Sequence, residues 1–147
     1  MNIVIIQYNA GNIQSVLYAL ERLGVQAMVT DNVELIQKAD KVIFPGVGEA
    51  STAMHYLKER GLDSVIQNLK QPVFGICLGM QLMCAYSEEN NTSCLGIFEE
   101  QVKLFKPTDS SNKVPQIGWN TIGSLKTNLF KGVSEESYAY FVHGYYA

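Results

Sequence analysis

The first two thirds of the chain alternate between short apolar runs and segments whose apolar residues recur at helical spacing. Ile3–Ile6 is a β-branched run without polar alternation, which is typical of a parallel strand covered on both faces. A helical pattern follows it and has a suitable stop at Gly24; its apolar positions are Ile13, Val16, Leu17, Leu20 and Leu23. The same reasoning predicts strands over 25–30, 42–44 and 72–76 and helices over 32–39, 49–60, 62–69 and 78–86. Strands that alternate with helices predict an α/β fold with a mostly parallel sheet flanked by helices.

The pattern changes after residue 86. Residues 87–93 are polar and rich in asparagine, which indicates a loop. The later elements that we predict are antiparallel strands over 96–106 and 117–125, turns at 107–112 and 123–124, a helical turn over 127–130 and an aromatic strand over 138–146. We expect these strands to extend the parallel sheet or to sit on its edge.

Composition narrows the class of protein. The length of 147 residues suits one domain, and a hydrophobic fraction of 47% excludes an intrinsically disordered chain. Eleven basic side chains against 14 acidic ones give a net charge of −3, so there is no basic excess to bind nucleic acid. No apolar run approaches the ~20 residues that span a bilayer, and the first residues lack the positive region of a signal peptide. We therefore expect neither nucleic acid nor a membrane as a partner.

The cysteines are Cys77, Cys84 and Cys94, an odd number without a Cys-x-x-Cys pair or a cluster at metal-ligand spacing. This usage argues against a disulfide scaffold and a metal site, and favours a reducing, cytoplasmic setting. Cys84 is expected to pack within a helix and Cys94 to lie in a loop.

The sequence Gly75-Ile76-Cys77-Leu78-Gly79 stands between a predicted strand and a predicted helix. It has the form of a nucleophile elbow, in which cysteine takes the place of serine. A sharp turn from strand to helix needs glycine on both sides of the nucleophile. It would place Cys77 at a helix N-terminus, where the thiolate is favoured, and would let the N–H of Leu78 donate to an oxyanion. A buried structural cysteine is the alternative interpretation.

The loop Pro45-Gly46-Val47-Gly48 follows another predicted strand. In a parallel sheet this loop could lie beside the elbow at the carboxyl edge, and the N–H of Val47 would then be a second oxyanion donor. An ordinary tight turn is the alternative. A dinucleotide site is excluded, because the spacing Gly-x-Gly-x-x-Gly fails after Gly48.

Further polar residues could complete a site. Gln81 would lie in the first turn after Cys77, where it could bind a polar substrate or simply be an exposed helix residue. A cysteine hydrolase also needs a histidine base with a group that orients it. The chain has only His55, in the middle of a predicted helix, and His143, in the last aromatic strand. Neither has the setting of a base beside a carboxylate, so we assign the base to neither.

Taken together, these motifs resemble the class I glutamine amidotransferases and, within that family, the glutaminase subunits of imidazole glycerol phosphate synthase. The resemblance runs over essentially the whole chain and implies a flavodoxin-like α/β domain. The matching blocks are 10–12, 15–16, 39–40, 45–48, 72–81, 87–89, 114–115, 118–120 and 140–143.

The resemblance implies a glutaminase that needs no cofactor and no metal. Cys77 would attack the side-chain amide carbon of glutamine, ammonia would leave, and water would hydrolyse the glutamyl thioester. The N–H groups of Leu78 and Val47 would hold the oxyanion, while Gly46, Gly48 and Gln81 would bind glutamine. The implied partner is the (β/α)8-barrel cyclase subunit of the synthase, which uses the ammonia in histidine biosynthesis.

The chain also departs from the family. Members continue past the Phe-Val-His strand to a His-Pro-Glu motif that supplies the base and its orienting carboxylate. No such motif occurs here, so we expect residues 1–147 to be one amidotransferase domain without its C-terminal portion and inactive alone. Other departures are Gln7, Asn9, Gln116 and Gly144. The alternative functions are a non-catalytic module that binds the cyclase, the glutaminase of another pathway, and an unrelated cysteine α/β protein.

Overall fold

The computed structural model describes residues 1–9, 11–109 and 112–147. The chain forms two compact units, one over Met1–Lys103 together with Ala147 and the other over Leu104–Tyr146. Parts of the matching block 10–12 and of the predicted turn 107–112 lie outside the described residues. No helix in the described ranges is long and apolar enough to cross a membrane.

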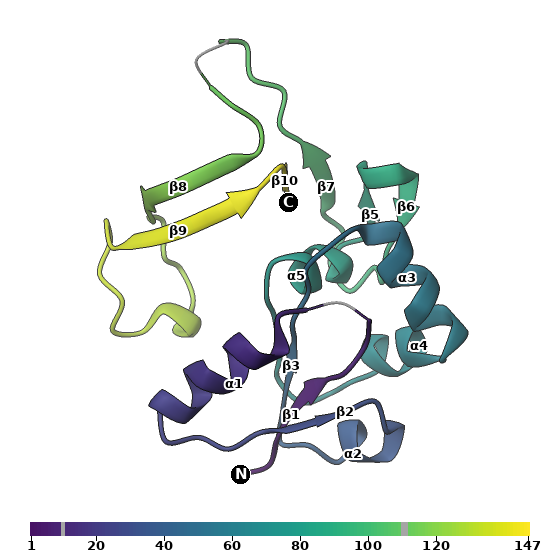
Figure 1. The fold of residues 1–147 in the computed structure, drawn as a ribbon. Coiled ribbons are helices and arrows are strands. Elements are labelled where there is room, and N and C mark those ends of the chain that lie inside the picture. The colour runs from purple at the N-terminus through teal and green to yellow at the C-terminus, as the bar shows by residue number, and fades with distance from the viewer. Residues whose placement is uncertain (10, 110–111) are drawn as a thin grey trace. The chain divides into compact units, whose positions relative to one another are not determined.

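A parallel sheet forms the centre of the first unit (Figure 1). Its strand order is β2-β1-β3-β4, with β1 at Ile3–Ile6, β2 at Met28–Thr30, β3 at Lys41–Phe44 and β4 at Val73–Gly75. Ile5 lies opposite Ile43, and Phe44 lies opposite Gly75. Every residue of β1 is buried, which explains its uninterrupted apolar run. The predicted α/β class with a parallel sheet is confirmed.

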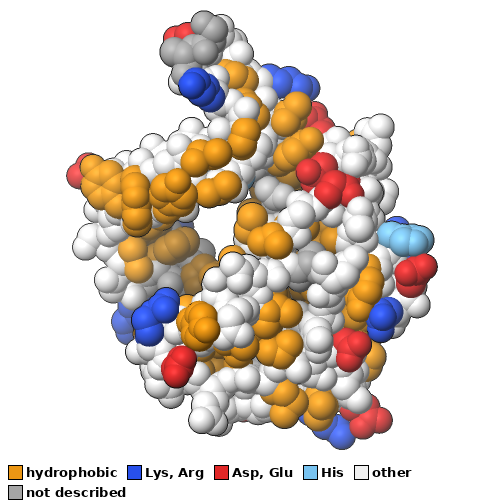
Figure 2. All heavy atoms as spheres, in the orientation of Figure 1, with side chains coloured by type: hydrophobic (Ala, Val, Ile, Leu, Met, Phe, Trp, Pro, Cys, Tyr) orange, Lys and Arg blue, Asp and Glu red, His pale blue; other side chains and the backbone are white. Residues whose placement is uncertain are grey.

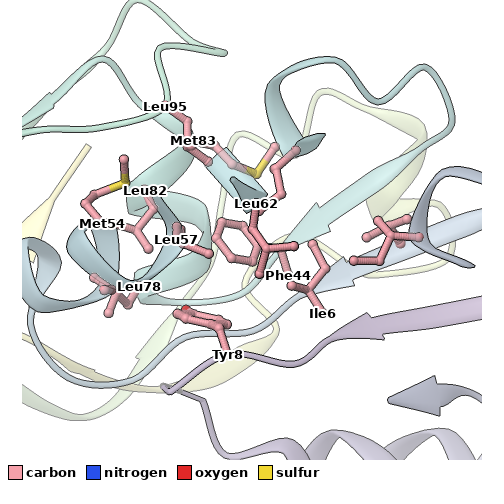
Figure 3. Close-up of a cluster of buried hydrophobic side chains, with 14 of the residues drawn as sticks. Ile6, Tyr8, Phe44, Met54, Leu57, Leu62, Leu78, Leu82, Met83 and Leu95 are labelled. Carbon is pink, nitrogen blue, oxygen red and sulfur yellow. The ribbon is translucent and has the colours of Figure 1, made fainter. Parts of the chain in front are cut away.

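Helices cover both faces of this sheet. On one face, α1 packs against Ile3, Ile5 and Ile43. On the other, α2 to α5 share a larger core with Phe44 at its centre (Figure 3). The helices are α1 at Ile13–Arg22, α2 at Val33–Gln37, α3 at Ala50–Glu59, α4 at Leu62–Gln67 and α5 at Leu78–Met83. Val4 and Ile6 belong to the larger core, so successive residues of β1 are buried in opposite layers.

The strand predicted over 25–30 is shorter in the structure, because its first residues close the preceding helix. The N–H of Gly24 donates to the carbonyl of Glu21, and the N–H of Val25 donates to that of Leu20, both at 2.9 Å. These bonds satisfy carbonyls that the end of α1 leaves unpaired. The pairing of β2 therefore begins only at Met28.

The segment 87–93, predicted as a loop, forms a small hairpin. Its strands are β5 (Tyr86–Ser87) and β6 (Thr92–Ser93), which pair antiparallel around the short helix η1 (Glu89–Asn91). A contact with α3 explains why this polar stretch is ordered. The carboxylate of Glu89 accepts the N–H of Ala50, the first residue of α3, at 2.8 Å.

The strand predicted over 96–106 is confined to β7 (Gln101–Leu104), which pairs parallel with β5. The expected antiparallel pairing with 117–125 is therefore wrong. Residues before β7 serve another purpose, since Gly96 donates its N–H to Cys84 and Ile97 donates its N–H to Met83, at 2.8 and 2.9 Å. They cap the end of α5 and so cannot continue a strand.

The second unit contains an antiparallel hairpin of β8 (Gln116–Thr121) and β9 (Tyr138–His143), in which Trp119 lies opposite Tyr140. This hairpin is a sheet of its own, so it does not extend the parallel sheet as expected. The predicted helical turn is present as η2 (Asn128–Phe130), and β10 spans Tyr145–Tyr146.

The strand predicted over 117–125 ends at Thr121. The N–H groups of Ser124 and Leu125 both donate to the carboxylate of Glu135 at 2.9 Å. These N–H groups are bound to a side chain and not to the backbone of a neighbouring strand, so the β-ladder stops before residue 124.

Candidate active site

Cys77 lies at the carboxyl end of β4, directly before the first residue of α5. Its backbone has φ +52° and ψ −118°, a region that costs a non-glycine residue about 1–3 kcal/mol. Its side chain is exposed. The alternative of a buried structural cysteine is therefore wrong, and the strain is of the kind found at catalytic turns.

Close backbone contacts explain both glycines of the elbow. A β-carbon on Gly79 would overlap the carbonyl oxygen of Phe44, and one on Gly75 would come within 2.6 Å of the Cα of Met80. The N–H of Ile76 donates to the same Phe44 carbonyl at 3.0 Å. The elbow is thus fixed against the end of β3.

The loop 45–48 leaves β3 beside this elbow. A β-carbon on Gly46 would overlap the nitrogen of Gly79, so the two backbones are in contact. Val47 is half exposed, at 50%, and Gly48 has φ +105°. The structure therefore brings the loop and the turn at Cys77 to one edge of the sheet. The roles of Leu78, Val47, Gly46 and Gly48 in binding an oxyanion or glutamine stay predictions.

Gln81 lies in the first turn of α5, where its N–H donates to the carbonyl of Cys77 at 3.1 Å. The residue is partly buried. Its position one turn from the sulfur is the predicted one, and its role in binding substrate stays a prediction.

The loop ends in a helix cap that the sequence analysis missed. The carboxylate of Glu49 accepts the N–H of Ser51 at 2.7 Å, and the N–H and hydroxyl of Thr52 at 3.0 and 2.6 Å. The side-chain amide of Asn90 also donates to it, at 2.8 Å. The bonds from Ser51 and Thr52 hold the pKa of Glu49 well below its usual range. Glutamate is not a favoured N-cap residue, so propensity alone could not identify this cap.

A buried tyrosine lies beneath the site and was also missed. The hydroxyl of Tyr8 donates to the carbonyl of Pro45 at 2.7 Å, and its ring packs on Phe44 with centroids 5.4 Å apart. Burial, and secondly the nearby charge of Cys77, raise the pKa of Tyr8 above its usual range. Nothing local in the sequence indicates this bond, because its partners are 37 positions apart.

Neither histidine is brought to Cys77 by any contact among the described residues. His55 lies on α3 with its Nε2 3.2 Å from an oxygen of Glu59, and both side chains are largely exposed. The expectation that His55 has no carboxylate beside it is wrong, although this pair lies on an open helix surface. His143 belongs to the second unit, where its Nδ1 is 2.8 Å from the carbonyl oxygen of Tyr145.

The other cysteines differ from Cys77 in their surroundings. Cys84 is buried at the end of α5, and burial raises the pKa of its thiol. Burial likewise raises the pKa of Cys94 to about 11, so little thiolate forms there at neutral pH. In the part of the chain that the structure describes, no group of three or more His, Cys, Asp or Glu side chains could hold a metal ion.

Comparison with known proteins identifies the class to which this fold and this site belong. The family model described as "Glutamine amidotransferase class-I" matches residues 4–147. A crystal structure described as a glutamine amidotransferase superposes with a TM-score of 0.67 at 18% identity, over 95% of this chain and 70% of that one. The chain belongs to the class I glutamine amidotransferases.

Within that family, the chain is similar to proteins named imidazole glycerol phosphate synthase subunit HisH. It is 60% identical to the one from Bacteroides fragilis, over 99% of this chain and 74% of that protein. It is 47% identical to the one from Pasteurella multocida, over 98% of this chain and 72% of that protein. The chain is accordingly an amidotransferase of histidine biosynthesis, and it spans about three quarters of the length of these relatives.

Proposed function

We propose that this chain supplies the glutaminase site of an imidazole glycerol phosphate synthase, with Cys77 as the nucleophile. The observation that carries the proposal is an exposed cysteine held at positive φ between a strand and a helix, beside a glycine loop. Such a turn presents sulfur at the edge of the sheet where α/β folds bind ligands. The similarity to HisH subunits supports glutamine as the substrate.

In the proposed reaction, the Cys77 thiolate attacks the side-chain amide carbon of glutamine and forms a carbon–sulfur bond. The carbonyl oxygen becomes an oxyanion, which accepts the N–H groups of Leu78 and Val47. As the tetrahedral intermediate collapses, the carbon–nitrogen bond breaks, and the leaving nitrogen takes up the proton that the Cys77 thiol released and departs as ammonia. Water then hydrolyses the thioester, which gives glutamate and restores the thiol.

Three further residues are assigned to glutamine binding. Gly46 and Gly48 present backbone without side chains that could obstruct a small ligand, and Gln81 offers an amide that can both donate and accept. These groups flank Val47 on the loop or follow Cys77 by one helical turn. We propose that they hold the amino acid end of glutamine.

We assign the general base to no described residue. His55 pairs with Glu59 on an exposed surface, and His143 is bound to the backbone of its own unit. The 147 residues contain no His-Pro-Glu sequence. We therefore propose that they hydrolyse glutamine by themselves orders of magnitude more slowly than a complete triad would.

The proposed partner is the (β/α)8-barrel cyclase subunit, joined in a heterodimer in the cytoplasm. An apolar face on the β8–β9 hairpin supports a protein partner, and hydrophobic side chains gather along that hairpin in Figure 2. Ile117, Trp119, Tyr138, Tyr140 and Val142 alternate along the two strands, and each is at least 54% exposed. Contiguous exposed apolar side chains of this kind mark protein interaction sites.

A thiol-reactive glutamine analogue, such as a chloroketone, tests the proposed site. We expect it to label Cys77 and excess glutamine to slow the labelling, because the reaction needs both a glutamine pocket and a reactive thiolate. Mass spectrometry of the digested protein locates the label. Cys77→Ser should abolish the labelling, and the matched variant Cys94→Ser should leave it unchanged. A labelling rate that excess glutamine does not change, or labelling mainly at Cys94, would contradict the proposal.

A further inference from the structure

The loop 45–48 is held at both ends and is open only at its middle. At its start, the buried Pro45 has its carbonyl fixed by Tyr8. At its end, Glu49 is bound to the first turn of α3 and to Asn90. Between these anchors Val47 and Gly48 are exposed. The direction of the Val47 N–H thus depends on how the first anchor holds the chain.

Tyr8 lies on the inner side of this loop. A β-carbon on Gly46 would overlap the Gly79 nitrogen and would come 2.7 Å from the Tyr8 hydroxyl. The Pro45–Gly46 segment is therefore in contact with both the tyrosine and the elbow. Figure 3 shows the Tyr8 ring among the buried side chains next to Phe44 and Leu78, and only 5% of the residue is exposed.

We propose that Tyr8 is a positioning residue, whose hydroxyl fixes the Pro45–Gly46 peptide and thereby sets the direction in which the Val47 N–H points. This inference rests on the proposed role of that N–H in binding the oxyanion. With the peptide plane fixed at its carbonyl, only the two backbone torsions of Gly46 separate it from the Val47 N–H. Because Gly46 is buried and its backbone lies directly against Gly79 and Tyr8, those torsions have little freedom.

The surroundings of Tyr8 keep its hydroxyl a donor. Burial, with the charge of Cys77 as the second cause, raises the pKa of Tyr8 above its usual range, so the phenol stays protonated at neutral and mildly alkaline pH. Removal of the hydroxyl would leave the Pro45 carbonyl without this donor at a site where the proline is buried. The peptide would then be free to reorient.

Tyr8→Phe tests this role, because it keeps the ring that packs on Phe44 and removes only the hydroxyl. Tyr18→Phe is the matched control, since Tyr18 lies on α1 and is 54% exposed. We expect amide hydrogen exchange in the peptide 45–49 to become about tenfold faster in Tyr8→Phe. In the presence of the cyclase subunit, we expect kcat for glutamine hydrolysis to fall about tenfold while KM stays within about twofold. Alkylation of Cys77 by iodoacetamide, which needs no oxyanion donor, should keep its rate.

Two results would overturn the role of Tyr8. One is a rate of amide hydrogen exchange in the peptide 45–49 that is the same in Tyr8→Phe as in the wild type. The other is a rate of iodoacetamide alkylation that falls as far as kcat, because Tyr8 would then act on the sulfur and not on the loop. Failure of the glutamine analogue to label Cys77 of the wild-type chain would contradict the proposed function, and the exchange rate would still decide whether Tyr8 fixes the loop.

Discussion

The β-carbon that Gly79 lacks would occupy the place of the Phe44 carbonyl oxygen. The carbonyl oxygen of Phe44 also accepts the N–H of Ile76, directly before Cys77. This oxygen therefore affects both the stability of the fold and the geometry of the candidate site. Gly79 is therefore required by a contact between the start of α5 and the end of β3. Sequence reasoning identified the motif and its steric cause, but it could not identify Phe44 as the group in contact.

Gly79→Ala should lower the free energy of unfolding by about 3 kcal/mol, the upper end of the usual cost of overpacking, because the added carbon would meet backbone that cannot move aside. Urea unfolding followed by circular dichroism measures the change. Gly144→Ala is the matched control, since its added carbon would lie at an ordinary 3.7 Å from Val114, and we expect a change within about 0.5 kcal/mol. Equal effects of the two substitutions would contradict this account of the elbow.

Tyr8 and Glu49 mark the limit of prediction at this scale. Cys77, Gly46 and Val47 stand in motifs that follow predicted strands, so the topology of a parallel sheet is sufficient to bring them to one edge. The two anchors of the loop are single polar residues without a motif. Their partners, Pro45 for Tyr8 and Asn90 for Glu49, become apparent only when the chain is folded.

At the scale of elements, the start of α3 depends on two carboxylates. Glu49 caps the helix from within its own segment, and Glu89 accepts the N–H of Ala50 from the hairpin β5–β6. Acidic groups at a helix N-terminus also interact favourably with the helix dipole. The candidate oxyanion loop therefore ends at a rigid point of the structure.

Glu49→Ala should destabilise the chain by about 1 kcal/mol at pH 7, as the loss of an N-cap typically does. The ordinary pKa of a glutamate is 4.5, and hydrogen bonds lower the pKa of Glu49 below that value in the folded protein. The contribution of Glu49 to the free energy of unfolding is therefore complete above pH 4.5 and is lost as the pH falls toward the folded-state pKa. The difference between wild type and Glu49→Ala should therefore shrink below about pH 4.5.

Chemical denaturation at pH 7, 5 and 3.5 measures that dependence. Glu21→Ala, on the exposed surface of α1, is the control variant. A difference for Glu49→Ala that stays constant or grows toward acid pH would show that the carboxylate is not stabilised by its hydrogen bonds in the folded protein.

The predicted elements were most accurate where burial alone decides the structure. β1 has the bounds that its apolar run indicates, because both faces of the strand are covered. The strands predicted over 25–30 and 96–106 were too long, since Val25 and Gly96 donate their N–H groups to the ends of helices. Such bonds depend on where the preceding helix stops, and hydrophobic patterning does not contain that information.

At the scale of the whole molecule, the two units carry different parts of the proposed function. The first holds the candidate nucleophile and loop, and the second presents the exposed face of the β8–β9 hairpin. The sequence predicted the strands of this hairpin through their aromatic and β-branched residues. It did not predict that they form a sheet of their own, because strand propensity does not specify a partner.

Trp119→Ala should weaken binding of the cyclase subunit about tenfold or more, since exposed tryptophans are frequent interface hot spots. Isothermal titration of the purified chain with the cyclase measures this affinity. Labelling of Cys77 by the glutamine analogue should be unchanged, because Trp119 is not among the residues proposed to bind glutamine. Tyr18→Ala serves as the control for loss of an exposed aromatic ring. Unchanged affinity of Trp119→Ala would contradict the assignment of this face to the partner.

The bond between Glu89 and Ala50 has a consequence for the order in which the protein is made. A ribosome releases the chain from the N-terminus, and domains fold as they emerge. Ala50 emerges 39 residues before Glu89, and the elbow at Cys77 emerges between them. We therefore expect a nascent chain that already contains the nucleophile to lack the finished start of α3. The start of α3, where the loop 45–48 ends, is therefore completed only after Cys77 has been made.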